Sequence, residues 1–443
     1  MDNQSAVQQL ITLIENSSKI KYRLESLRIL RKISSNYEKY GGKRDFLISF
    51  FENLLISDTD EIIRNEAALI LCQDYKDKAL NPMSWALHHE ESQLCLQTIF
   101  NSLIKLIEDL TSIKEPIAKL IMVHEIKQIS DKDFNIGFEI LKSVRGTSDF
   151  TLRDLADILI NYYAIVYLKK SFWRLKYRIE ECKIIELDFI FKGLTKLPSA
   201  IKHLTYLKKL ILRYNQITEL PDWIESLHAL ESLNLNVNNI NKLPTTIGSL
   251  SHLTELMLWK NELHDLPDSI CSLHSLKYLN LRLNQIKRLP YDLGNLINLI
   301  ELNLHDNKLN EIPESISSLR SLEKLNLSWN LLESLPSSIS NLISLKSLDI
   351  ERNELVQIPI SIGSLTSLEI LNLGDNKIEK IPETIGNLKK LRILNISRNR
   401  LTSLPKSLDH LENLEELYIS ENKLDINSNF LQNLKNKGLK IYL

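Results

Sequence analysis

The stretch LNLSWNLLESLP, from Leu325 to Pro336, places an asparagine, Asn330, inside a run of leucines and ends in a proline. A buried amide is unfavourable unless its donor and its acceptor both find partners. The chain nevertheless repeats both residues, each with a step of 23 residues. The asparagines are Asn215, Asn238, Asn261, Asn284, Asn307, Asn330, Asn353, Asn376, Asn399 and Asn422, and the prolines are Pro198, Pro221, Pro244, Pro267, Pro290, Pro313, Pro336, Pro359, Pro382 and Pro405. The sequence therefore contains an internal repeat.

Each unit reads L-x-x-L-x-L-x-x-N-x-L-x-x-L-P-x-x-I-x-x-L. Leu325 and Leu327 alternate with Asn326 and Ser328, which predicts a short strand with one buried face. We expect the strands to stack in parallel into one curved sheet, with Asn330 and its equivalents buried as a ladder and Asn326 exposed. The proline cannot join a sheet, so the chain should turn there to the convex side and form one short 3-10 or helical turn.

This pattern resembles the leucine-rich repeat family from residue 184 to the end of the sequence, over about eleven units. Both ends depart from it. Lys192 stands where the first unit should have its asparagine, and the last unit lacks its proline. There Leu439 and Ile441 are expected to form a closing strand as the equivalents of Leu417 and Ile419. Residues 162–179 are predicted to be a helix that covers the open edge of the first unit.

Residues 1–180 have a different texture, with two prolines and an apolar period near 3.6. One segment resembles a HEAT-repeat helix, because Asp60, Arg64, Ala67, Ala68 and Leu71 occupy the positions that this family favours. Arg23 precedes Arg64 by 41 residues, a HEAT-like spacing. The predicted fold is thus an α+β repeat protein: an α-helical, HEAT-like domain over 1–180, then a leucine-rich repeat α/β solenoid (horseshoe) over 181–443 with a parallel concave sheet.

The formal net charge of -1 gives no electrostatic footprint for nucleic acid. The four cysteines, at 72, 95, 182 and 271, show no C-x-x-C pairing, which favours a reducing compartment. No secretory signal is recognisable at the N-terminus, and the most apolar helical stretch is too short to span a bilayer. These features predict a cytoplasmic protein without membrane insertion.

No motif for catalysis or for a cofactor is recognisable. The segment YGGKRDF lacks the spacing of a phosphate-binding loop, and the zinc-protease, esterase and kinase signatures are missing from the sequence. His88, His89, Glu90 and Glu91 are adjacent, but neighbours on a helix point about 100° apart and do not make a common ligand face. Cys182 and Cys271 could be nucleophiles, as in some bacterial leucine-rich repeat ubiquitin ligases. Those proteins carry a separate catalytic domain beside the repeats, and nothing in this sequence resembles it. We therefore expect neither an enzyme nor a metal site nor a cofactor.

The solvent-facing positions of each strand lie four and two residues before the repeat asparagine, with a third position one residue before it. In the later repeats they are small, as at Gly374, Ser397 and Ser420. In the earlier repeats they carry the large aromatic, cationic and thioether side chains that dominate protein interfaces. The predicted partner-binding residues are Arg213, Tyr214, Met257, Trp259, Arg282, His305, Trp329 and Arg352.

The LPxxIxxLxxL form of the repeat resembles the intracellular repeats of Scribble-type, Ras-suppressor-type and plant Ras-group-related proteins. That resemblance implies a cytoplasmic adaptor whose protein partner is a Ras-like small GTPase or a phosphatase complex. The favoured function is a non-enzymatic protein–protein interaction scaffold in intracellular signalling. The alternatives are a substrate-recognition subunit of an enzyme complex, such as a ubiquitin ligase, and an extracellular receptor or polysaccharide binder.

Overall fold

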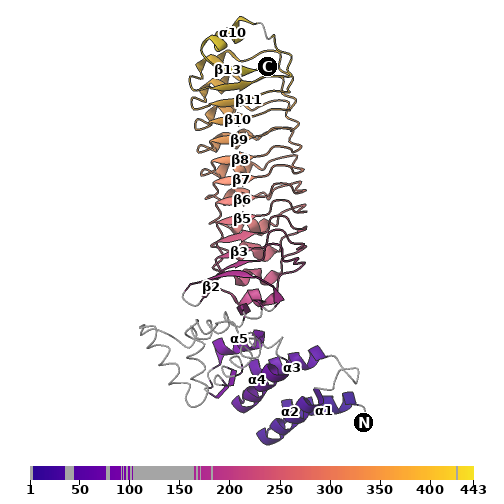
Figure 1. Ribbon diagram of the computed structural model, residues 1–443. Coiled ribbons are helices and arrows are strands. Elements are labelled where there is room, and N and C mark those ends of the chain that lie inside the picture. Colours follow the sequence, from indigo (N-terminus) through magenta and orange to yellow (C-terminus); the bar gives the residue numbers. More distant parts are fainter. Residues whose placement is uncertain are drawn as a thin grey trace. The chain divides into compact units, whose positions relative to one another are not determined.

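The computed structural model of the chain describes residues 3–34, 44–75, 80–90, 92, 94–95, 98–99, 102, 164–165, 168–169, 171–180, 183–425 and 428–443. The chain divides into two compact units (Figure 1). One comprises residues 1–174 and 181–183, and the other comprises residues 175–180 and 184–443.

The first unit consists of helices in its described part. They are α1 (Asn3–Asn16), α2 (Ile20–Ser34), α3 (Arg44–Ser57), α4 (Glu61–Asp74) and α5 (Leu80–His89). Helix α1 packs on α2 and α3 packs on α4, and the two pairs meet where α2 packs on α4. Each helix buries aliphatic or aromatic residues, among them Ile14, Leu27, Phe51 and Leu71, which form the core of this unit.

Ion pairs join the ends of these helices. Asp60 caps α4 by accepting from the backbone N–H groups of Ile62 and Ile63. Four residues later, Arg64 forms two hydrogen bonds with the carboxylate of Glu90, at 2.7 and 2.8 Å. Arg23 makes the corresponding pair with Asp58. The two arginines therefore have similar roles in successive helix pairs, as a HEAT-like repeat predicts, and membership of that family stays a prediction.

The second unit is a solenoid built on one sheet of 13 strands, in which each strand pairs with its neighbours in the sequence (Figure 1). The strands are β1 (Lys176–Glu180), β2 (Lys183–Asp188), β3 (Lys209–Ile211), β4 (Ser232–Asn234), β5 (Glu255–Met257), β6 (Tyr278–Asn280), β7 (Glu301–Asn303), β8 (Lys324–Asn326), β9 (Ser347–Asp349), β10 (Ile370–Asn372), β11 (Ile393–Asn395), β12 (Glu416–Tyr418) and β13 (Lys440–Tyr442). Leu302, Leu325 and Leu348 lie opposite one another in parallel register. The 23-residue step of the sequence is thus the register of the sheet, as predicted.

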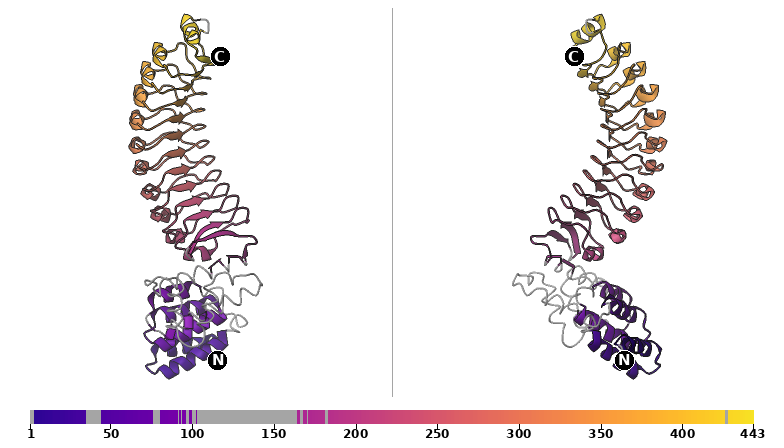
Figure 2. Two further views of the ribbon diagram at one scale, coloured as in Figure 1. Left: turned by 60° about the vertical axis from the view of Figure 1, so that its left-hand side comes forward. Right: turned by 90° about the vertical axis from the view of Figure 1, so that its right-hand side faces the viewer.

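A 3-10 helix follows the proline of each unit and forms the convex side. These helices are η3 (Ser199–His203), η4 (Asp222–Ser226), η5 (Thr245–Ser249), η6 (Asp268–Ser272), η7 (Leu293–Asn295), η8 (Glu314–Ser318), η9 (Ser337–Asn341), η10 (Ile360–Ser364), η11 (Glu383–Asn387) and η12 (Lys406–His410). Pro336 precedes η9 with φ of -62°, and its carbonyl accepts from the N–H of Ile339 at 3.1 Å. Figure 2 shows the short helices along the outer side of the curve and the strands along the inner side. The predicted convex turn is confirmed.

The repeat asparagines form the predicted ladder. Asn330 is 6% exposed. Its Nδ2 donates to the carbonyls of Leu304 and Leu327, each at 3.0 Å, and its Oδ1 accepts from the N–H of Leu309 at 2.9 Å. Because Leu304 and Leu309 belong to the preceding unit, one amide both closes its own turn and fastens that turn to its neighbour.

The residue before each ladder asparagine adopts a left-handed backbone. Trp329 has φ of 57° and Arg352 has φ of 53°, and the same conformation recurs at this position in every unit from Phe191 to Glu421. A left-handed conformation is uncommon for bulky residues and is tolerated where surrounding structure fixes it. Here the Trp329 N–H donates to the Glu351 carbonyl at 2.8 Å, which is one of the contacts that hold the turn. The sequence pattern had not indicated this conformation.

The N-terminal edge of the sheet differs from the prediction. Residues 176–180, which were expected to belong to a covering helix, form strand β1 and pair with β2. The helix prediction is wrong for this part of the segment. A strand can occupy the backbone N–H and C=O groups of β2, which a helix laid over the edge would leave unpaired.

The C-terminal register also differs. Ile441 lies opposite Leu417, and not opposite Ile419 as the sequence had suggested. The last unit replaces the 3-10 turn by the longer helix α10 (Asn429–Asn436), which Ser428 caps. The extra residue that this helix takes up shifts the closing strand by one position relative to the other units.

We expect Asn330→Ala to lower the free energy of unfolding by about 1–3 kcal/mol, because three buried backbone groups lose their partner. Asn341→Ala is the matched control, since Asn341 is exposed at the end of η9. Urea denaturation followed by circular dichroism measures both. Equal midpoints for the two variants would contradict the role given to the ladder.

We also expect β1 to keep the solenoid monomeric. A fragment of residues 175–443 retains this strand, whereas a fragment of residues 183–443 exposes the edge of β2. Size-exclusion chromatography with light scattering should show a monomer for the longer fragment and oligomers for the shorter one. If both fragments are monomeric, β1 is not needed as an edge cover.

Candidate functional site

Four of the eight predicted binding residues, Arg213, Trp259, Arg282 and His305, stand in one column, two residues before a ladder asparagine. The positions two residues before the ladder asparagines are linked rung to rung by backbone hydrogen bonds. The carbonyls of Asn236, Trp259 and Arg282 accept from residues of the preceding unit at 3.0, 2.7 and 2.8 Å. The rungs of parallel strands are about 4.8 Å apart, so side chains in this column have fixed neighbours.

A second line of asparagines lies beside this column, at the last strand position of most units. Its members are Asn234, Asn280, Asn303, Asn326, Asn372 and Asn395, with Asp349 as a variant. Asn326 shows its role, because its Oδ1 accepts from the backbone N–H of Ser328 at 2.9 Å and from its hydroxyl at 2.6 Å. Asn326 is therefore half-buried and bonded, and the expectation that it is exposed was wrong.

Met257 interrupts this second line. Without an asparagine at that position, the N–H of Trp259 turns to the side chain of Asn236 in the preceding unit, at 2.8 Å. Met257 and Trp259 are both half-buried on the concave face. The Nε1 atom of Trp259 is shielded from solvent and has no hydrogen-bond partner among the described residues. The concave face is thus apolar at this rung, and the N–H of Trp259 Nε1 is a hydrogen-bond donor without an acceptor among the described residues.

At the N-terminal end of the solenoid, an arginine lies over one of two stacked aromatic rings. The Tyr214 ring stacks on Phe191, with centroids 4.6 Å apart and planes inclined by 13°. The guanidinium of Arg213 lies 4.7 Å from the centroid of the Tyr214 ring. Its Nε, like Trp259 Nε1, is shielded from solvent and has no partner in the described part of the chain. Phe191 is 71% exposed.

On the middle units, an arginine and a histidine hold the ring of a tryptophan in a fixed orientation. Trp329 is 44% exposed. The guanidinium of Arg352 lies 3.9 Å from the centroid of the Trp329 ring. The centroid of the His305 ring lies 6.1 Å from that of Trp329. Arg352 is fixed in turn by Asp375, with Nε 3.0 Å from Oδ2. The indole is therefore oriented before any partner arrives.

A hydrogen bond to a buried serine fixes the ring of His305. Its Nδ1 lies 2.7 Å from the hydroxyl of Ser328. Since that hydroxyl donates to Asn326, it accepts from Nδ1–H, which leaves Nε2 of the neutral ring as an acceptor. Burial, and secondly the charge of Arg282, lower the pKa of His305. Ser328 is only 2% exposed, so the Ser328–His305 pair does not present a hydroxyl nucleophile to a substrate.

The structure thus brings the eight predicted residues to one face in two groups. Arg213, Tyr214, Met257, Trp259 and Arg282 lie on the N-terminal rungs, and His305, Trp329 and Arg352 lie on the middle rungs. Two exposed apolar neighbours were not predicted from the sequence. Phe191 stands at the equivalent of Trp329 in the first unit, and Leu331, which is 51% exposed, follows the ladder position after Trp329. Extending the repeat alignment to the first unit would have identified Phe191.

Away from the sheet, the other candidates have structural roles. Burial raises the pKa of Cys271 to about 11 and that of Cys72 to about 12, so both thiols are protonated at neutral pH. Cys182 lies outside the described residues. His89 stacks on Trp85 with ring centroids 4.3 Å apart, while Glu90 binds Arg64. Within the described residues no group of three or more histidines, cysteines or acids is placed to hold a metal ion.

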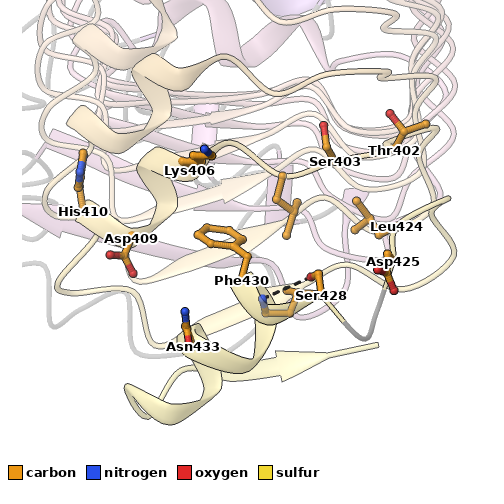
Figure 3. A pocket seen from close by; sticks show the side chains of 12 residues that line it. Thr402, Ser403, Lys406, Asp409, His410, Leu424, Asp425, Ser428, Phe430 and Asn433 are labelled. Carbon is orange, nitrogen blue, oxygen red and sulfur yellow. Dashed lines mark hydrogen bonds between the residues drawn. The ribbon is translucent and has the colours of Figure 1, made fainter.

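A pocket lies at the C-terminal end of the solenoid, where α10 replaces a 3-10 helix. Its volume is about 540 Å³. The Phe430 ring projects from α10 into the space beside η12 (Figure 3). Leu404, Leu424 and Leu431 add apolar surface, and the polar side chains around them include Lys406 and Asp425. The pocket contains none of the sequence-predicted residues.

The sequence matches two models of the same family. The model described as "Leucine-rich repeat region" matches residues 260–353 and 336–439, and the model described as "Leucine rich repeat" matches residues 191–240. The chain therefore belongs to the leucine-rich repeat proteins. No curated protein sequence is significantly similar to the chain.

Solved structures of other leucine-rich repeat proteins are similar to parts of this chain. The functional domain of InlJ from Listeria monocytogenes is 25% identical with a TM-score of 0.50, and the match covers 58% of this chain and 53% of that one. The ectodomain of the Arabidopsis receptor kinase HAESA, in complex with an IDA peptide hormone ligand, is 32% identical with a TM-score of 0.49 and coverage of 56% and 44%. A Leptospira interrogans leucine-rich repeat protein is 28% identical, with a TM-score of 0.36 and coverage of 57% and 82%.

Proteins of this fold generally use the extended concave sheet to bind other proteins, and the repeat itself is typically a non-enzymatic element. None of the helices in the described ranges is both long and apolar enough to cross a membrane.

The lowered pKa of His305 predicts a pH-dependent stability. The unfolded chain binds a proton at this ring near its ordinary pKa of about 6.5, whereas the folded chain does so only at lower pH. Stability should therefore fall as the pH drops below about 6.5, and this part of the loss should be missing in His305→Gln. Urea denaturation of both proteins at neutral and mildly acidic pH gives the comparison. An identical pH dependence of the two would contradict the assignment.

Proposed function

We propose that this leucine-rich repeat chain is a non-enzymatic scaffold that binds a protein partner on the concave face of its sheet. The observation that carries the proposal is the exposed Trp329 ring, which Arg352 and His305 hold in place. Aromatic and arginine side chains that are fixed before binding lose little entropy in an interface and often dominate its affinity. The proposed contact residues are the eight on the two groups of rungs.

The proposed setting is intracellular signalling in the cytoplasm. Cys72, Cys95 and Cys271 are free and buried, which is in keeping with a reducing compartment. The resemblance of the repeat to Ras-suppressor-type and Scribble-type proteins suggests a Ras-like small GTPase as the partner, and a panel of such GTPases is the first set to test. The helical unit, in this proposal, joins the repeats to a second component of the same assembly.

The test compares two double variants of the full chain. Trp259→Ala with Arg282→Ala should weaken partner binding by at least about 2 kcal/mol, because both side chains face the partner. The melting temperature should hardly change, since neither residue belongs to the apolar core. Ser397→Arg with Ser420→Arg, on the later rungs, should matter much less. Affinity is measured by titration calorimetry with each GTPase that the wild-type chain retains.

Two outcomes would overturn this proposal. Undiminished binding by the Trp259/Arg282 variant together with loss in the Ser397/Ser420 variant would move the site to the C-terminal rungs. Loss only on deletion of the helical unit would move it away from the sheet.

A further inference from the structure

The charges along the concave face are not neutralised evenly. On the later rungs each arginine pairs with the acid of the next unit, as Arg352 does with Asp375 and Arg398 with Glu421, both at 3.0 Å. On the earlier rungs Arg213 and Arg282 form no ion pair among the described residues. They stand in one column, three rungs apart, with Asn236 and Trp259 between them.

Two acids in the flanking columns are engaged elsewhere. Glu255 accepts from the hydroxyl of Ser232 at 2.6 Å, and Glu262 accepts from Nδ2 of Asn239 at 2.9 Å. Both carboxylates are therefore engaged with the neighbouring unit in flanking columns. Lys260, beside Trp259, adds a further cation. The strip formed by Arg213, Asn236, Trp259 and Arg282 thus holds two cations and no acid of its own, and Asp306 lies on the next rung after Arg282.

The same strip has hydrogen-bond donors without acceptors. Arg213 Nε and Trp259 Nε1 are both shielded from solvent, and neither has a partner in the described structure. A buried donor without an acceptor is unfavourable, so a ligand that supplies acceptors gains affinity when these side chains turn toward it. Met257 adds apolar surface next to the Trp259 ring. The ligand must therefore combine negative charge, acceptor oxygens and an apolar group.

We propose that this strip binds an extended acidic segment of the partner, with carboxylates four residues apart and an apolar residue midway. Three rungs correspond to about 14 Å at 4.8 Å per strand. An extended chain rises about 3.3 Å per residue, so side chains at i and i+4 lie about 13 Å apart on one face, with i+2 between them. The two carboxylates meet Arg213 and Arg282, and the apolar side chain lies against Met257 and Trp259. The proposal rests on the concave face being the binding surface.

The probe is a capped, fluorescein-labelled peptide, Gly-Ser-Glu-Ser-Leu-Ser-Glu-Ser-Gly, titrated with the full chain by fluorescence anisotropy. Arg213→Gln with Arg282→Gln should weaken its binding at least about tenfold. Arg288→Gln with Arg320→Gln is the matched control, because it removes the same charge from exposed arginines outside the concave strand positions. Trp259→Phe keeps an aromatic ring but lacks the N–H, and it should weaken binding by roughly threefold.

The peptide itself provides the second comparison. Replacing both glutamates by glutamine should abolish binding, and a peptide of the same composition with adjacent glutamates should bind more weakly. Equal binding of the glutamate and glutamine peptides, or equal losses in the two arginine double variants, would overturn the proposal. If the concave variants still release the protein partner while the peptide does not bind, the acidic segment is wrong and the proposed function stands. If the concave variants bind the protein partner with the same affinity as the wild-type chain, the proposed function itself is wrong.

Discussion

The hydrogen bonds of the repeat asparagine are the interaction on which the solenoid depends. Each turn has to leave the sheet, and its backbone groups would otherwise be buried without partners. Asn330 solves this with one side chain by donating to Leu304 and Leu327 and accepting from Leu309. Aspartate would lack the donors and leucine would lack both functions. The strict 23-residue spacing follows, because a shifted amide would miss the preceding unit.

The same turn determines the proposed binding surface. Once the ladder fixes the backbone, the residue before the asparagine is held in a left-handed conformation, as for Trp329 and Arg352. The residue two positions before it follows the strand directly, and its carbonyl is bonded to the preceding unit, as for Trp259. The repeat therefore supplies a rigid array of positions whose side chains are free to vary. Such a surface suits protein recognition, because little order has to be gained on binding.

The candidate site was predictable in its members but not in its internal contacts. The sequence places Trp329, Arg352 and His305 at surface positions of adjacent units, which follows from periodicity alone. It does not indicate that Arg352 covers the indole while Asp375 holds Arg352. These contacts depend on side-chain rotamers that two units adopt together. Whether Arg213 and Arg282 find an acid to pair with likewise depends on neighbours across rungs, and neither forms an ion pair with a described residue.

The sequence by itself determined the solenoid, its parallel register and the convex turns, because each unit repeats its buried leucines, its asparagine and its proline at a fixed step. The prediction from the sequence was wrong at the two ends of the solenoid, where the repeat pattern is lost. Only the tertiary structure decided that residues 176–180 pair with β2 as a strand, and that α10 shifts Ile441 opposite Leu417. The reason is physical: inside the array each unit sees the same neighbour on both sides, whereas an end unit must satisfy an open edge with whatever chain lies beside it.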